Sequence, residues 1–189
     1  MAHRVCPWWL GYWLVSPLRR LREPPRQLLA PHVAPGMMVI EPGCGMGYFT
    51  LELARMVGPG GKVVAVDLQP RMLAGLRRRA RRAGLAGRID ARLAAPDRLG
   101  LDDLAGSADL AVVLHVVHEV PDPRRFFAEL ARALRPGGRV LVVEPRWHVK
   151  PADFAAELDA AAAAGLVLVE RPPARGGPAA VLGRPDASR

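Results

Sequence analysis

The chain has 189 residues, of which 50% are hydrophobic and 24% charged, and this composition is typical of one globular domain with a substantial core. Its two cysteines, Cys6 and Cys44, exclude a disulfide-stabilised scaffold and favour a reducing, cytoplasmic location. The net charge of +9 rests on 25 arginines and 2 lysines in a chain rich in Ala, Gly and Pro, so it indicates a GC-rich coding bias more than a nucleic-acid surface.

The first part of the chain does not follow the pattern of the rest. Residues 1–35 hold three of the four tryptophans and several prolines and arginines, and they show no regular period. We therefore expect an N-terminal extension over residues 1–35 and a folded domain over residues 36–189. Pro7, Gly11 and Pro17 interrupt the aromatic stretch, and no apolar run of about 20 residues occurs anywhere, so we expect neither a signal peptide nor a membrane span.

From Met37 onward, short apolar runs alternate with helical patterns. The expected strands are Met37–Ile40, Lys62–Val66, Arg88–Arg92, Asp109–Leu114, Arg139–Val143, Leu166–Val169 and Ala179–Leu182. The expected helices are Arg71–Ala83, Pro123–Leu134 and Ala152–Ala164, and the motif Arg135-Pro136-Gly137-Gly138 predicts a turn after the second of these helices. This rhythm predicts an α/β fold with a doubly wound sheet and a ligand at the carboxyl ends of its strands.

The first expected strand ends in a glycine-rich turn. Glu41 is followed by Gly43, Gly45 and Gly47, and a helical pattern begins directly afterwards. Glycines at a strand-to-helix turn let the backbone approach a ligand closely. Asp67 ends the second strand 20 residues after Gly47, where an acid can bind ribose hydroxyls. The ligand is therefore expected to contain a ribose.

The spacing of the turn argues against a dinucleotide. The dinucleotide motif needs a glycine in its sixth place, and Tyr48 stands there. Glu41 at the mouth of the turn would repel a pyrophosphate but would attract a cation. S-adenosylmethionine has a ribose, a sulfonium and an ammonium group, and it fits these requirements.

These motifs resemble those of the class I S-adenosylmethionine-dependent methyltransferases. The resemblance rests on the glycine turn with Glu41, on Val63-Val64-Ala65-Val66-Asp67, and on Leu134-Arg135-Pro136-Gly137-Gly138, and it covers roughly residues 36–184. It is closest to the type 11 group, which includes quinone-biosynthesis C-methyltransferases and arsenite methyltransferases. It implies a Rossmann-like, seven-stranded sheet whose last strand is antiparallel.

The resemblance also implies roles for individual residues. The methionine part of S-adenosylmethionine would lie against Glu41 and the three glycines, the ribose against Asp67 and the adenine against Leu68. Many relatives have an acid after the third strand, and here Ala94 or Ala95 takes that place, which leaves adenine recognition to the backbone or to Asp97. The expected cofactor-binding residues are Glu41, Gly43, Gly45, Gly47, Asp67, Leu68, Ala95 and Leu114.

The segment after the fourth strand is the expected place for the chemistry. His118 stands there, and an uncharged imidazole in a partly buried cleft has a suitable pKa for a general base. The pair His118-Glu119 resembles the His-Asp pair of plant-type O-methyltransferases, in which the histidine is the base. The alternative is that His118 caps a helix or orients a loop.

Three further residues are candidate substrate contacts: Cys6, Trp9 and His148. The first two lie in the aromatic extension, which has three open interpretations: a lid that walls a flat or apolar acceptor, packing on the sheet edge, or peripheral membrane contact through residues 8–22. No metal site is expected, because the spacing of His115, His118 and Glu119 matches no metal motif. Cys44 is expected to be a packing residue inside the glycine turn.

Three functions are compatible with these features. Methyl transfer to a small-molecule acceptor, directed at oxygen, carbon or sulfur, is the first. Methylation of RNA or another nucleic acid is the second, but the segment after the fourth strand lacks both the Asn/Asp-Pro-Pro-Tyr/Phe stretch and the catalytic cysteine of such enzymes. A non-catalytic S-adenosylmethionine- or nucleotide-binding protein on the same fold is the third.

Overall fold

The computed structural model describes residues 7–9, 11, 15, 23–174 and 176–186. The chain forms two compact units, and the boundary between them lies between Ala94 and Ala95. The N-terminal unit (up to Ala94) contains the glycine turn, and the C-terminal unit (from Ala95) contains His118.

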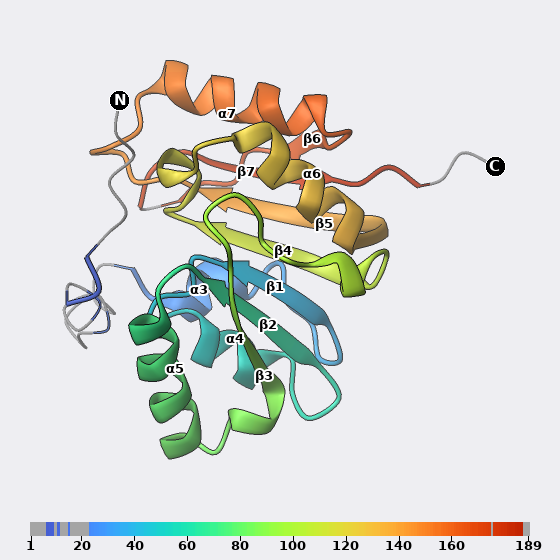
Figure 1. Cartoon of the computed structure of the whole chain (residues 1–189). Coiled ribbons are helices and arrows are strands. Elements are labelled where there is room, and N and C mark those ends of the chain that lie inside the picture. The colour runs from blue at the N-terminus through green and yellow to red at the C-terminus, as the bar shows by residue number, and fades with distance from the viewer. Residues whose placement is uncertain (1–6, 10, 12–14, 16–22, 175, 187–189) are drawn as a thin grey trace. The chain divides into compact units, whose positions relative to one another are not determined.

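The N-terminal unit has a parallel sheet with the strand order β3-β2-β1. β1 and β2 are buried along most of their length, as their continuous Val and Ile runs predict. Helices α4 and α5 pack against β2, and α5 also packs against β3 (Figure 1). Its elements are α3 (Pro25–Leu29), β1 (Met38–Pro42), α4 (Thr50–Met56), β2 (Lys62–Asp67), α5 (Pro70–Arg82), η1 (Ala86–Arg88) and β3 (Ile89–Leu93).

The C-terminal unit has a mixed sheet with the strand order β4-β5-β7-β6. β4 and β5 are parallel, whereas β7 runs antiparallel to both β5 and β6. Helix α6 packs on β5 and against α7, which lies next to β6 (Figure 1). Its elements are η2 (Asp102–Leu104), β4 (Ala108–Leu114), η3 (Val117–Glu119), α6 (Pro123–Ala133), β5 (Leu134–Val143), α7 (Pro151–Ala163), β6 (Val167–Glu170) and β7 (Ala179–Gly183).

The expected α/β class and the antiparallel last strand are confirmed. The three expected helices and six of the seven strands begin and end within two residues of their predicted limits. The turn expected at 135–138 is wrong as a separate element, because β5 already begins at Leu134. Gly137 N donates to Arg184 O at 3.0 Å, and Arg184 N donates to Gly138 O at 2.8 Å, so this glycine-rich stretch is tied to the segment after β7.

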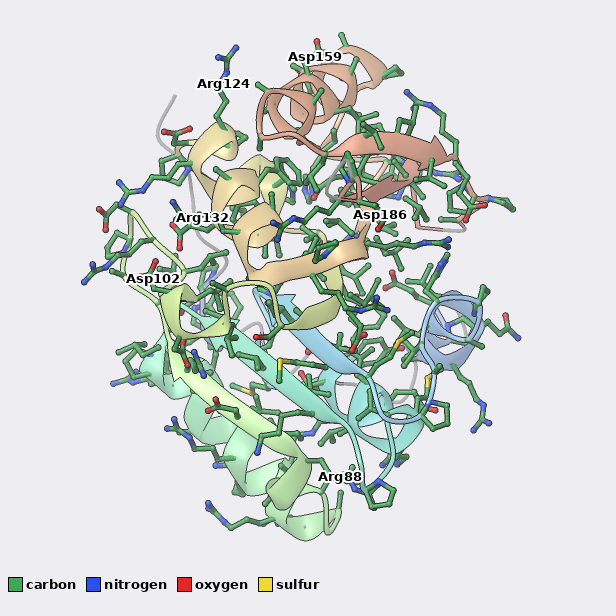
Figure 2. The ribbon with its side chains drawn as sticks, turned by 90° about the vertical axis from the view of Figure 1, so that its right-hand side faces the viewer. Arg88, Asp102, Arg124, Arg132, Asp159 and Asp186 are labelled. Atoms are coloured by element: carbon green, nitrogen blue, oxygen red, sulfur yellow. The ribbon has the colours of Figure 1, made fainter. Side chains whose placement is uncertain are left out.

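Charged side chains lie on the outside of the helices. Arg124 of α6 and Asp159 of α7 are exposed and point away from the ribbon (Figure 2). The arginines of α5, among them Arg77, Arg78 and Arg81, are exposed, whereas Leu73 and Leu76 are buried. None of the helices in the described part of the chain is both long and apolar enough to cross a membrane.

Candidate functional site

The turn between β1 and α4 has a backbone that favours glycine. Gly43, Gly45 and Gly47 have φ angles of 67°, 53° and 82°, which lie in the left-handed region. A Cβ on Gly47 would lie 2.4 Å from Leu76 Cδ1, so this glycine also allows close packing on α5. A Cβ on Gly45 would meet nothing within 4 Å, so the backbone at Gly45 is open to a ligand.

Asp67 at the end of β2 holds this turn in place. Its Oδ2 accepts a hydrogen bond of 2.8 Å from Gly45 N, and its Oδ1 accepts one of 2.8 Å from Gln69 N. Burial raises the pKa of Asp67, and these backbone hydrogen bonds oppose the rise. Because a carboxylate oxygen accepts more than one hydrogen bond, Asp67 keeps acceptor capacity for the hydroxyls of a ribose.

Glu41 is a buried acid without a strong partner. Its side chain is 3% exposed, and its Oε2 has no hydrogen-bond partner among the residues that the structure describes. Burial raises the pKa of Glu41 to about 8, and the nearby Asp67 carboxylate adds to this rise. The Thr50 hydroxyl opposes the rise, although this hydroxyl makes no hydrogen bond of ordinary geometry to a described residue. A neutral buried carboxyl of this kind gains most from a cationic ligand that restores its charge.

Two apolar side chains lie exposed next to Asp67. Leu68 is 40% exposed and Leu93 58% exposed, and Leu93 is the register partner of Asp67 across the β2–β3 pair. Exposed leucines beside a buried acid suit a ligand that has an apolar ring and a hydroxylated sugar. The N-terminal unit therefore fits the parts of S-adenosylmethionine that the resemblance assigned to Glu41, Asp67 and Leu68.

Cys44 is confirmed as a packing residue. It is 5% exposed and belongs to a cluster with Ala65, Leu73 and Leu76. Burial, followed by the nearby Glu41 carboxyl, raises its pKa well above the ordinary thiol value. A thiol that stays protonated in an apolar cluster is not a nucleophile.

Two expected cofactor contacts belong to the C-terminal unit. Ala95 N donates to Arg98 O at 3.1 Å, and Leu114, at the end of β4, is 7% exposed. The contacts of Ala95 and Leu114 with a cofactor stay predictions. His115, which follows β4, has a φ angle of 60°, and such a conformation is uncommon for a residue other than glycine.

His118 lies in η3 and is hydrogen-bonded through Nδ1 to Glu144 Oε2. Glu144 directly follows β5 and is fully buried, and its Oε1 accepts from Val116 N at 3.0 Å and from Val117 N at 2.9 Å. The pKa of His118 is raised, first by the hydrogen bond to Glu144 and further by the nearby carboxylates, while burial opposes the rise. The structure thus pairs His118 with Glu144, which the sequence analysis did not single out.

Two further groups surround the His118 ring. The ring of His148 stacks on it with the centroids 5.8 Å apart and the planes 22° apart, so two expected site residues are brought together. Glu119 Oε1 lies 4.0 Å from His118 Nε2. The His118 side chain is 24% exposed.

Glu157 of α7 completes this group of titratable residues. It is 7% exposed, and its Oε2 has no hydrogen-bond partner among the described residues. Burial, with the charge of Glu144 as the second cause, raises its pKa to about 8, while the charge of His118 opposes the rise. No pattern in the Ala-rich sequence of α7 distinguishes Glu157. Glu144, by contrast, is an acid at the end of an apolar strand, as Asp67 is, and this position could have identified it from the sequence.

Before residue 23, the structure describes the N-terminal extension at positions 7–9, 11 and 15. The guanidinium of Arg71 lies 4.5 Å from the centre of the Trp8 ring, and a Cβ on Gly11 would lie 2.7 Å from Met72 Sδ and 3.1 Å from Met46 Cε. Residue 11 therefore packs closely on Met46, which is inside the glycine turn. Trp9 is 59% exposed, and Cys6 lies outside the described residues.

Membrane contact through residues 8–22 stays a prediction, because most of that segment lies outside the described residues. In the described ranges, no three His, Cys, Asp or Glu residues are grouped so that they could hold a metal ion.

Comparisons with known proteins point to one family. A family profile described as "Methyltransferase domain" matches residues 40–142, which is more than half of the chain. The ubiquinone/menaquinone biosynthesis C-methyltransferase UbiE of Pasteurella multocida is 31% identical over 112 residues, which are 59% of this chain and 41% of that protein. The arsenite methyltransferase of Halobacterium salinarum is 34% identical over 110 residues, which are 58% of this chain and 27% of that protein.

Solved structures show the same fold. A SAM dependent methyltransferase from Aquifex aeolicus matches with a TM-score of 0.81 over 95% of this chain and 98% of that chain, at 21% identity. The expected Rossmann-like, seven-stranded fold is therefore confirmed. In sequence, the matched part spans less than half the length of each of the two curated relatives named above.

The buried acids make stability depend on pH. The pKa values of Glu41 and Glu157 are raised from 4.5 to about 8. At pH values between 4.5 and about 8, the folded protein therefore binds more protons than the unfolded chain does. The free energy of unfolding should therefore fall as the pH rises from about 5 to about 8, and His118, whose pKa is also raised, contributes in the same direction. Urea unfolding of the ligand-free protein at several pH values measures this slope.

Glu41→Gln keeps the side chain neutral and should make the slope shallower. Glu170→Gln, on the exposed strand β6, is the matched control and should leave the slope unchanged. Equal slopes in Glu41→Gln and the wild type would contradict a raised pKa at Glu41.

Proposed function

Because the chain belongs to the methyltransferase domain family, we propose that it transfers a methyl group from S-adenosylmethionine to a small-molecule acceptor. The observation that carries this proposal is the buried carboxyl of Glu41 beside the left-handed glycine turn. S-adenosylmethionine supplies an electrophilic methyl group when it is bound. The alternatives are RNA methylation and cofactor binding without catalysis. The similarity to small-molecule methyltransferases supports the main proposal over both alternatives.

The N-terminal unit provides the groups that would hold this cofactor. The ammonium group would return Glu41 to its charged form, and the open backbone at Gly45 would accommodate the methionine part. Asp67 would accept hydrogen bonds from the ribose hydroxyls, and Leu68 would contact the adenine. A pyrophosphate would face the Glu41 carboxyl, so this residue selects against dinucleotides.

The first test concerns Asp67. Asp67→Ala should weaken binding of S-adenosylmethionine about 10- to 100-fold, because a charged acceptor for the ribose and the support of the Gly45 amide are both lost. Isothermal titration calorimetry with S-adenosylmethionine and S-adenosylhomocysteine measures the change. Asp159→Ala is the control, since Asp159 is exposed on α7. Binding of NAD without a response to S-adenosylhomocysteine would exclude the proposed function.

The C-terminal unit provides the proposed general base. An acceptor that reacts through a hydroxyl or an acidic carbon must give up a proton as the new bond to the methyl carbon forms. His118 Nε2 would take this proton, since Nδ1 is already occupied by Glu144. A thiolate or metalloid acceptor carries its own electron pair and needs no base.

The second test concerns His118. With a hydroxyl or carbon acceptor, His118→Ala should lower kcat about 10²–10⁴-fold and leave cofactor affinity within about twofold, because only proton removal is lost. The measurement is formation of S-adenosylhomocysteine beside calorimetry on the same protein. Arg124→Ala, at an exposed position on α6, is the control, and it should keep full turnover. Full turnover of His118→Ala on such an acceptor would remove His118 from the mechanism.

The extension over residues 1–35 would act as a lid for the acceptor site. Supporting this role, residue 11 packs on Met46 in the glycine turn, and Trp9 offers a large exposed aromatic surface. The pairing of Trp8 with Arg71 supports packing as a second role of the same segment. A lid of this kind excludes water from the transfer step.

The third test concerns this lid. Trp9→Ala should raise KM for the acceptor about 5- to 30-fold through the loss of aromatic contact area, with cofactor affinity unchanged. Trp147→Ala is the matched control, because Trp147 is 88% exposed on the C-terminal unit. An unchanged KM in Trp9→Ala would contradict a contact between Trp9 and the acceptor.

A further inference from the structure

We propose that Glu144 is a positioning residue that fixes both the ring orientation and the tautomer of His118, so that Nε2 is the free acceptor edge. This inference rests on the proposed role of His118 as the base. Glu144 touches neither the acceptor nor the cofactor in the proposed reaction.

The arrangement around the Glu144 carboxylate supports this role. One oxygen, Oε1, accepts from the consecutive amides Val116 N and Val117 N, which fixes the carboxylate against the backbone that leads into His118. The other oxygen, Oε2, faces His118 Nδ1. A carboxylate accepts hydrogen bonds and donates none, so Nδ1 must carry the proton. In the neutral ring, Nε2 then holds the free electron pair.

The backbone at Glu144 is itself tightly held. Glu144 N donates to Pro178 O at 3.0 Å, and Arg146 N donates to Gly176 O at 3.2 Å. A Cβ on Gly177 would lie 2.0 Å from Glu144 O, so the loop before β7 packs closely on the backbone of Glu144. A rigid carboxylate that is fully buried orients a ring better than an exposed and mobile one does.

Other groups near the ring cannot take over this role. Glu119 Oε1 is 4.0 Å from Nε2, which is beyond hydrogen-bond distance, and it is on the opposite nitrogen. His148 stacks on the ring face and does not define which nitrogen is protonated. Glu157 makes no hydrogen bond to Nδ1 and influences His118 only through the charge that it carries when ionised. Glu144, Glu119 and Glu157 therefore all raise the pKa of His118, and Glu144 alone among them bonds Nδ1.

The variant Glu144→Gln tests this role with almost no change of shape. The carboxamide oxygen can still accept from Val116 N and Val117 N, while its NH2 group faces Nδ1 as a donor. Nδ1 must then become the acceptor, so the proton moves to Nε2 and the base is lost. We expect kcat to fall about 100-fold or more on a hydroxyl or carbon acceptor, with KM and cofactor affinity within about threefold. Glu170→Gln, on the exposed strand β6, is the control and should retain full activity.

The tautomer is measured directly by long-range ¹H–¹⁵N correlation NMR on ¹⁵N-histidine-labelled protein, which needs no acceptor. The wild type should show His118 with its proton on Nδ1, and Glu144→Gln should show it on Nε2 with a lowered pKa. In the wild type, kcat/KM should increase with pH as His118 loses its proton, at a pH set by its raised pKa. In Glu144→Gln this increase should be absent.

Two results would overturn the inference. One is a wild-type His118 that carries its proton on Nε2, which can be seen even if Glu144→Gln does not fold. The other is an unchanged tautomer and pKa in Glu144→Gln. Failure of the proposed function is seen separately, as a wild-type protein that binds no S-adenosylmethionine or forms no S-adenosylhomocysteine while the tautomer of His118 is as expected.

Discussion

Each unit depends on a buried carboxylate that follows one strand and accepts backbone N–H groups from the turn after the neighbouring strand. Asp67 at the end of β2 bonds Gly45 N in the turn after β1, and Glu144 after β5 bonds the two amides after β4. Irregular turns leave amides that a sheet cannot satisfy, and a carboxylate satisfies them with strong, charge-assisted bonds. The same two acids lie next to the groups proposed to hold the cofactor and to remove a proton.

Other acids are buried at a cost in stability. Glu41 and Glu157 each have a carboxylate oxygen without a partner in the described structure, and each has its pKa raised to about 8 by burial. A fold selected for stability alone would replace such groups by apolar side chains. Their presence at the end of β1, next to the glycine turn, and beside the His118 cluster is the pattern expected of functional positions, where perturbed acids are retained for the chemistry.

The two units carry different parts of the proposed reaction. The N-terminal unit offers acids and open backbone to a cationic ligand with a ribose, and the C-terminal unit offers a histidine whose Nδ1 is already occupied. The turn after β1 requires glycine for its positive φ angles, and the turn after β4 places His115 at a φ angle of 60°. The backbone after both strands therefore departs from ordinary conformations. Backbone of this kind is typical of the ligand edge of α/β sheets.

The sequence by itself determined the order of strands and helices, the glycine turn and the roles expected for Glu41 and Asp67, because hydrophobic period and backbone preference are local properties of the chain. It did not determine the start of β5, since hydrogen bonds with Arg184, almost fifty residues later, extend the strand across a glycine motif that reads locally as a turn. It also did not reveal the pairing of His118 with Glu144 or the burial of Glu157. These contacts join residues from η3, the end of β5 and α7, and only tertiary packing brings them together and excludes water, which is what shifts their pKa values.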